Sequence, residues 1–121
     1  MNTSKVLNVL SWVLVVLLAV LFLLAAAGKL MGGAGQMFEN WGYPRWFATF
    51  IGITELAGAI GLLIPKTTKF AILGLSGIMI GAAYTHLSNG EGLAVLRPII
   101  FAAVLWTVWF LRRYSFSSAV K

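Results

Sequence analysis

A single acid, Glu55, interrupts an otherwise apolar stretch, residues 51–64 (IGITELAGAIGLLI). No other charged residue occurs between Trp46 and Pro65. A carboxylate at a bilayer centre costs on the order of a few kcal/mol, so intramembrane acids usually belong to a functional site or have a partner. A protonated or hydrogen-bonded glutamic acid between packed helices could also be purely structural. Both roles of Glu55 are therefore open.

Three further ionisable side chains, Lys29, His86 and Arg97, lie near the ends of apolar runs. With the topology derived below, they are expected at the outer membrane surface, above a deeper Glu55. Each also has a simpler explanation, because Lys and Arg near helix ends often extend to the headgroups and a His can cap a helix. As a group they predict a polar cavity that is open to the outside. Glu and His in an apolar bundle would suit a quinone, which needs proton donors and acceptors inside an apolar sheath.

Several kinds of chemistry lack the residues they need. The chain has no Cys and no Asp, which excludes thiol catalysis, cysteine-ligated clusters and a Ser-His-Asp triad. One His and one deep Glu fall short of the ligands that zinc requires, so no metal site is predicted. Haem ligation by Met and His stays open. The nine Lys and Arg residues flank apolar runs rather than forming one basic face, so no nucleic-acid partner is expected.

The composition is that of an integral membrane protein. Of 121 residues, 60% are hydrophobic and only 10% are charged, whereas soluble domains carry about 25% charged residues. We predict one transmembrane domain, residues 1–121, folded as an all-α four-helix bundle with up-down-up-down topology. The predicted spans are residues 6–27, 46–64, 70–87 and 92–111.

The connections between these spans are short. Residues 28–45 are expected to form a surface turn, and residues 66–69 (KTTK) make the second and third spans antiparallel neighbours. Residues 115–121 are expected to be a frayed polar tail. The first span ends in three alanines, as a cleaved signal peptide could, but its 22 residues exceed the usual length of about 7–15, which favours an uncleaved helix. Aromatic side chains typical of membrane interfaces occur at both ends of the spans: Trp41, Tyr43, Trp46, Trp106, Trp109 and Tyr114.

Small residues predict where helices approach closely. Glycines in the third span repeat at intervals of three and four, and the second span carries a similar set, so these two helices are expected to be in close contact. The predicted helix-packing glycines are Gly52, Gly58, Gly61, Gly74, Gly77 and Gly81.

The distribution of Lys and Arg predicts the orientation. The amino terminus, second loop and carboxyl tail carry six of them, Lys5, Lys66, Lys69, Arg112, Arg113 and Lys121. The other two loops carry three, Lys29, Arg45 and Arg97. Because cytoplasmic loops are enriched in Lys and Arg, both termini are expected in the cytoplasm, in a bacterial inner membrane.

Four segments together resemble the DoxX-like family of small four-helix membrane proteins. They are AAAGKL (25–30), FENWGYPRWF (38–47), IGITELAGAIGLL (51–63) and IMIGAAYTHL (78–87). The positions that match the family pattern are Lys29, Gly42, Pro44, Gly52, Glu55, Leu56, Gly58 and His86. The resemblance implies a four-helix bundle. It also implies a link to membrane redox complexes, since some relatives are named as subunits of a thiosulfate:quinone oxidoreductase.

Three functions remain in competition. The first is an accessory subunit that binds a quinone or lipid and has no enzymatic activity as an isolated chain. The second is a structural scaffold or chaperone-like partner of another membrane protein. Besides the lipid bilayer, the expected partner is another membrane protein or, in a homo-oligomer, further copies of the chain. The third, less favoured, is a small proton-coupled transporter in which Glu55 alternately holds a proton and a cation.

Overall fold

The computed structural model describes residues 2–120, with the side chains of residues 2–112. Within that part the only regular structure is helical. The elements are α1 (Thr3–Leu30), α2 (Gly35–Asn40), α3 (Arg45–Leu63), α4 (Thr68–Ser88), the 3-10 helix η1 (Gly92–Val95) and α5 (Leu96–Val120). In the described part, α1, α3, α4 and η1 joined to α5 make four helices long and apolar enough to cross a membrane. The predicted all-α four-helix bundle is confirmed.

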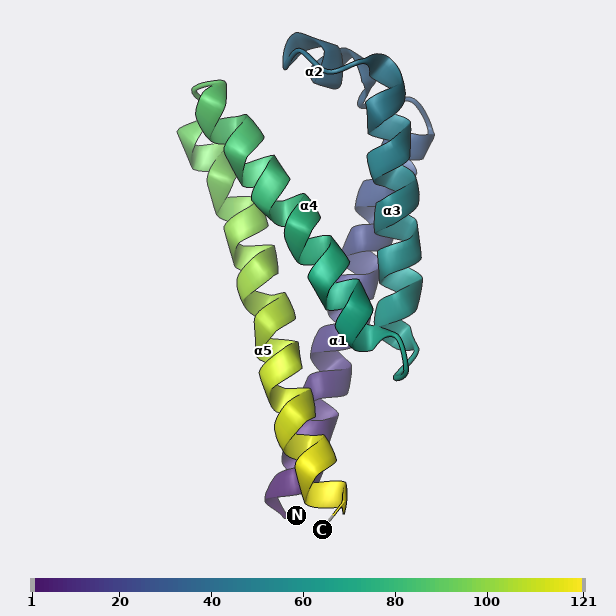
Figure 1. Cartoon of the computed structure of the whole chain (residues 1–121), viewed down its shortest axis with the longest axis vertical. Coiled ribbons are helices and arrows are strands. Elements are labelled where there is room, and N and C mark those ends of the chain that lie inside the picture. The colour runs from purple at the N-terminus through teal and green to yellow at the C-terminus, as the bar shows by residue number, and fades with distance from the viewer. Residues whose placement is uncertain (1, 121) are drawn as a thin grey trace.

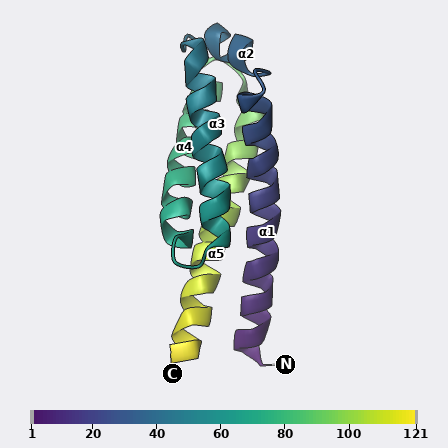
Figure 2. The same ribbon diagram turned by 90° about the vertical axis from the view of Figure 1, so that its right-hand side faces the viewer.

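The four long helices form a closed ring of contacts. Helix α1 packs against α3 and α5, and α4 packs against the same two helices. Chain direction alternates around the ring, so the chain's two ends lie at the same end of the bundle as the α3–α4 turn (Figure 1). We call this the terminal end, and we call the opposite end, which carries α2, the α2 end. Helices α1 and α5 extend beyond the α3–α4 turn at the terminal end (Figure 2).

Apolar side chains from all four long helices fill the centre of the ring. Phe22 of α1 is fully buried and meets Phe101 of α5 edge to face, with ring centroids 5.4 Å apart. The other buried members of this core are Val15, Leu18, Ala19, Ala59, Leu62, Ala71, Ile72, Leu75, Met79, Leu105 and Val108. The bundle therefore has one continuous apolar core that reaches from its middle towards the terminal end.

A second apolar cluster closes the α2 end. Phe38 of α2 is buried against Trp41, Tyr43 and Phe47. The segment 28–45, which was expected to be only a surface turn, thus contains a short helix. The physical reason is the anchoring of Phe38, whose aromatic neighbours hold α2 against the start of α3.

Helices α1 and α5 extend three or more residues beyond the predicted spans. Helix α1 begins three residues before residue 6 and ends three residues after residue 27, with the side chain of Asn2 accepting a hydrogen bond from the Lys5 backbone at its start. Helix α5 continues to Val120, where the sequence suggested a frayed tail. No Gly or Pro follows Arg112, so nothing in the local sequence ends the helix. The side chain of Tyr114, predicted for an aromatic belt, lies outside the described residues.

Glycines of α3, but not those of α4, lie at the α3–α4 contact. A Cβ atom on Gly58 would lie 2.6 Å from Leu75 Cδ2, and one on Gly61 would lie 3.2 Å from the Cβ of Ala71. The predicted close approach of these two helices therefore occurs. The glycine stripe of α4 does not contribute to it, because a Cβ atom at any of its positions would meet nothing within 4 Å. These positions are Gly74, Gly77 and Gly81.

Candidate functional site

Glu55 occupies a core position of α3. The buried residues of this helix recur at intervals of four and three, which places them on one face. They are Ala48, Gly52, Glu55, Ala59 and Leu62. Glu55 retains only 3% of its accessible surface. An acid therefore stands where the helical pattern calls for an apolar side chain, and it needs a partner.

The partner of Glu55 is Lys29, near the end of α1. The Lys29 Nζ atom lies 2.8 Å from Glu55 Oε1, and the two side chains are 21% and 4% exposed. The pair is formally neutral, which offsets part of the large cost of removing each charge from water. The Lys29 ammonium also lies in the last turn of α1, where the helix dipole favours a cation.

Gly52 brings the end of α1 close enough for this pair to form. A Cβ atom on Gly52 would lie 3.0 Å from the Cβ of Lys29 and 3.3 Å from the Ala26 carbonyl oxygen. Gly52 follows the start of α3 at Arg45 by seven residues, or about 10 Å at about 1.5 Å per residue. The last turn of α1 therefore lies well below the start of α3. Lys29, which was expected at the rim of a cavity, instead reaches the deeper carboxylate.

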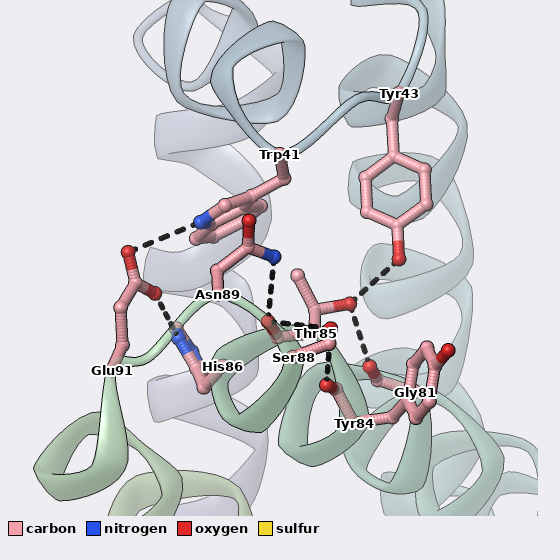
Figure 3. A network of polar contacts seen from close by, with 9 residues as sticks. All are labelled: Trp41, Tyr43, Gly81, Tyr84, Thr85, His86, Ser88, Asn89 and Glu91. Atoms are coloured by element: carbon pink, nitrogen blue, oxygen red, sulfur yellow. Dashed lines mark hydrogen bonds and ion pairs between the residues drawn. The ribbon is translucent and has the colours of Figure 1, made fainter.

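His86 belongs to a different cluster, at the α2 end (Figure 3). Its Nδ1 atom lies 2.7 Å from Glu91 Oε1, and Trp41 donates its indole N–H to the other oxygen of the same carboxylate at 3.2 Å. The Trp41 and His86 rings meet edge to face, with centroids 5.3 Å apart. The three side chains connect the α2–α3 segment, α4 and the α4–η1 turn.

Backbone geometry places Glu91 beside His86. Helix α4 ends at Ser88, and Gly90 then takes a φ of +73°, a conformation that favours glycine. The chain turns back, so that the Glu91 backbone N–H donates to the His86 carbonyl at 2.8 Å. Glu91 is a residue of this cluster that was not predicted from the sequence. The available signal in the sequence was the turn at residues 88–92 (SNGEG), which brings Glu91 back to His86, five residues earlier.

The Glu91 carboxylate is stabilised in its charged form. Its pKa is lowered from the ordinary value, first by the hydrogen bond with His86 and second by the hydrogen bond from Trp41. This side chain is 41% exposed, so the surrounding water weakens its interactions. The cluster is thus a surface contact whose strength depends on pH.

A second set of hydrogen bonds continues this network along α4 (Figure 3). The Tyr43 hydroxyl lies 2.8 Å from the hydroxyl of Thr85, which itself donates to the Gly81 carbonyl. Asn89 donates its side-chain amide to the Thr85 carbonyl at 2.8 Å. These bonds tie the α2–α3 connection to the last turn of α4.

The four predicted site residues therefore do not form one cluster. Lys29 and Glu55 form a buried pair, and His86 belongs to the network at the α2 end. Within residues 2–112, no hydrogen bond or ion pair joins Glu55 to His86. Arg97 is exposed near the start of α5 and makes no such contact with the described side chains. Within the same residues, no group of three or more His, Cys, Asp or Glu side chains could hold a metal ion.

An apolar groove runs between α3 and α4, with a volume of about 690 Å³. Its lining extends along α3 from Phe50 to Ile64, which directly follows the helix; these fourteen steps of about 1.5 Å span about 21 Å. The absence of side chains at Gly58, Gly61 and Gly74 contributes to the hollow. Neither Glu55 nor His86 lines it.

Comparison with known proteins gives one match. The model of the DoxX-like family matches residues 13–108, most of the chain. Searches of curated proteins and of solved structures found no match.

Proposed function

Because the chain belongs to the DoxX-like family, we propose that it is an accessory membrane subunit that binds a small, largely apolar molecule, a quinone or a lipid. The α3–α4 groove is the observation that carries this proposal. Its volume lies within the range of about 300–1,000 Å³ that is typical of ligand sites, and its walls are almost entirely apolar. The length of the groove and its apolar lining suit an isoprenoid or acyl chain.

The lining of the groove contains two threonine hydroxyl groups. Thr54 donates its hydroxyl hydrogen to the Ile51 carbonyl, and Thr67 donates to the Gly61 carbonyl, each at 2.8 Å. Because both donors are engaged, each oxygen retains acceptor capacity for a ligand. Such acceptors favour a molecule that carries its own hydroxyl, such as a quinol or a lipid with a hydroxylated headgroup.

Electron transfer, if the bound molecule is a quinone, belongs to a partner protein. The chain has no Cys, and the described residues offer no metal-binding group. The excess of Lys and Arg at the terminal end supports an orientation with both termini in the cytoplasm of a bacterial inner membrane.

The proposal is tested by filling the groove without disturbing the helix contact. Gly74 lines the groove and a Cβ atom there meets nothing within 4 Å, so Gly74→Leu adds bulk to the groove alone. Gly77→Leu is the matched control on the same helix, since Gly77 is equally unobstructed and does not line the groove. The measurement is thermal unfolding of purified protein in detergent, with and without a short-tailed ubiquinol and a short-chain lipid.

A ligand at about 100 times its Kd stabilises the folded state by about 2.7 kcal/mol. We expect this stabilisation in the wild type and in Gly77→Leu, and its loss in Gly74→Leu. Equal stabilisation of all three proteins would exclude the groove as the binding site.

A structural role is the second candidate, and the Lys29–Glu55 pair favours it. The pair joins α1 to α3 at the point where Gly52 allows the two backbones to approach. Glu55→Gln keeps the shape and an acceptor oxygen for the Lys29 ammonium but removes the charge, so a scaffold should keep its fold and partner binding at reduced stability. Glu55→Leu removes the acceptor as well and should disturb the packing. Partner binding that is abolished by Glu55→Gln in a correctly folded protein would count against a purely structural carboxylate.

The transporter hypothesis gains no support from this geometry. A carrier carboxylate must exchange its proton for a cation, whereas Glu55 already has an ammonium at 2.8 Å.

A further inference from the structure

The charges of the chain are divided unequally between the two ends of the bundle. All three acids have a basic partner inside the chain: Glu39 with Arg45, Glu55 with Lys29, and Glu91 with His86. None of these pairs lies at the terminal end. The cations of that end therefore have no carboxylate side chain available in their own chain.

One of these cations, Arg112 of α5, is held in a fixed position. Its Nε–H donates to the hydroxyl of Ser11 on α1, a residue with no exposed surface. Its guanidinium carbon lies 4.5 Å from the centre of the Trp12 ring, within the range of a cation–π contact. Helices α1 and α5 are direct neighbours, and both reach the terminal end (Figures 1 and 2).

The hydrogen-bonding capacity of this guanidinium is largely unused. It has five N–H donors, and Ser11 accepts from one of them. Its Nη2 atom is buried and has no hydrogen-bond partner among the described residues. A positioned cation with unmatched donors is costly unless an anion or another acceptor completes it.

We propose that Arg112 is a binding site for the phosphate group of an anionic phospholipid in the membrane leaflet at the terminal end. A guanidinium offers charged N–H donors that a phosphate oxygen accepts, and here the contacts with Ser11 and Trp12 hold it in position. The site combines residues of α1 and α5 and is separate from the α3–α4 groove.

The surroundings of Arg112 are those of a lipid headgroup site. Trp109 lies three residues earlier on α5 and contacts Trp106 with the two rings tilted by 45°. Tryptophan is enriched at membrane interfaces. The Lys69 Nζ atom lies 5.4 Å from the centre of the Trp109 ring, which brings a second cation to this level. On α1, Val16 follows Trp12 by one turn and is 49% exposed, so it offers a surface for an acyl chain.

The test compares two arginines of the same helix. The full-length protein is purified in detergent, and its affinities for phosphatidylglycerol and phosphatidylcholine are measured by native mass spectrometry. Arg112→Gln removes the proposed site. Arg97→Gln removes the same charge from an exposed position near the other end of α5. We expect the wild type and Arg97→Gln to prefer phosphatidylglycerol, and Arg112→Gln to bind it about tenfold more weakly, as for the loss of a charged hydrogen bond.

Further variants and a second ligand separate a phospholipid site from a nonspecific effect of charge and from a site for free phosphate. Arg112→Lys keeps the charge but loses the guanidinium that Ser11 and Trp12 hold in position, so its affinity should also fall. Full affinity in Arg112→Lys, or equal losses in Arg112→Gln and Arg97→Gln, would show that only net charge matters and would overturn the site. Binding of inorganic phosphate as tight as that of phosphatidylglycerol would overturn the assignment to a lipid. Should Arg112→Gln fail to fold, Trp12→Leu provides the same comparison through loss of the stacking surface.

The preference for phosphatidylglycerol should be unchanged in Gly74→Leu, because the groove lies between other helices. Failure of this proposal is thereby distinguishable from failure of the proposed groove.

Discussion

At the α2 end of the bundle and in the half that adjoins it, each acid of the chain meets a base of the chain, whereas the terminal end has bases without acids. At the α2 end and in the adjoining half, folding alone brings each acid to its basic partner. At the terminal end, no acidic side chain accepts the N–H donors of Arg112. The difference indicates that electrostatics at the α2 end stabilises the fold, while at the terminal end it is available for the membrane.

The largest effect on stability is expected from the replacement of Glu55, in the part of the bundle where each acid is paired with a base. Glu55→Leu leaves the Lys29 ammonium, which is only 21% exposed, without its partner. We expect a loss of about 3 kcal/mol in the free energy of unfolding, as is typical when one member of a buried pair is removed. The double variant Lys29→Met/Glu55→Leu should recover most of this loss, because it leaves no buried charge. Reversible unfolding in detergent measures both, and a double variant that is no more stable than Glu55→Leu would contradict a coupled pair.

Much of the fold follows from the sequence, because its strongest signals are apolar length and turn residues. Four apolar runs with short connections are sufficient for an all-α bundle. The exceptional character of Glu55 was also visible, since an acid in an apolar run is costly whatever the final packing. The identity of its partner was not, because Lys29 reaches Glu55 only through the close approach at Gly52, which depends on the relative position of two helices along their axes.

It was harder to predict which face of each helix is buried in the bundle, and α4 shows why. In a soluble bundle the buried face is apolar and the opposite face polar, so periodicity reveals the interior. In a membrane both faces are apolar. On α4, Leu75 and Met79 are buried while the glycines Gly74 and Gly77 face outwards, and the hydrophobic pattern does not separate the two sets. The glycine spacing predicted a close contact without showing which helix supplies the glycines.

The second-largest effect is expected at Glu91, where it depends on pH. Its pKa in the folded protein lies below the ordinary value of 4.5, so the contacts with His86 and Trp41 stabilise the fold above that pH and are lost as the pH falls through the lowered pKa. Below pH 4.5 the Trp41 indole should therefore lose its acceptor. Trp41 fluorescence, taken as the difference between the wild type and Trp41→Phe, should change in this range.

Two variants test whether Glu91 causes the change in fluorescence. Glu91→Gln should remove the acid-dependent change in fluorescence. Glu39→Gln should retain it, because Glu39 pairs with Arg45 and makes no contact with this network. An unchanged transition in Glu91→Gln would assign the pH dependence to another group.

At the terminal end, Lys69 should have a smaller effect on stability than either acid. Its ammonium contacts the Trp109 ring and is exposed to solvent, where a cation–π contact contributes about 0.5 kcal/mol. Lys69→Gln should lower the free energy of unfolding by about that amount. Lys66→Gln, in the adjoining α3–α4 turn, is the matched control and should have no measurable effect. A loss in Lys69→Gln as large as that in Glu55→Leu would mean that the terminal end also stabilises the fold through its charges.

The smallest effect is expected at Glu39, although its distance to Arg45, 2.5 Å between Oε1 and Nε, is shorter than that of the buried pair. The two side chains are 43% and 60% exposed, and solvent screening reduces such pairs to about 0.3 kcal/mol. Glu39→Gln should therefore leave the unfolding free energy nearly unchanged. Arg45→Ala should cost more, because the Arg45 stem also packs against Gly35, where a Cβ atom would lie 2.9 Å from it. Equal effects of the two variants would assign the contribution of Arg45 to its charge rather than to its packing, and burial would then no longer distinguish Glu39 from Glu55.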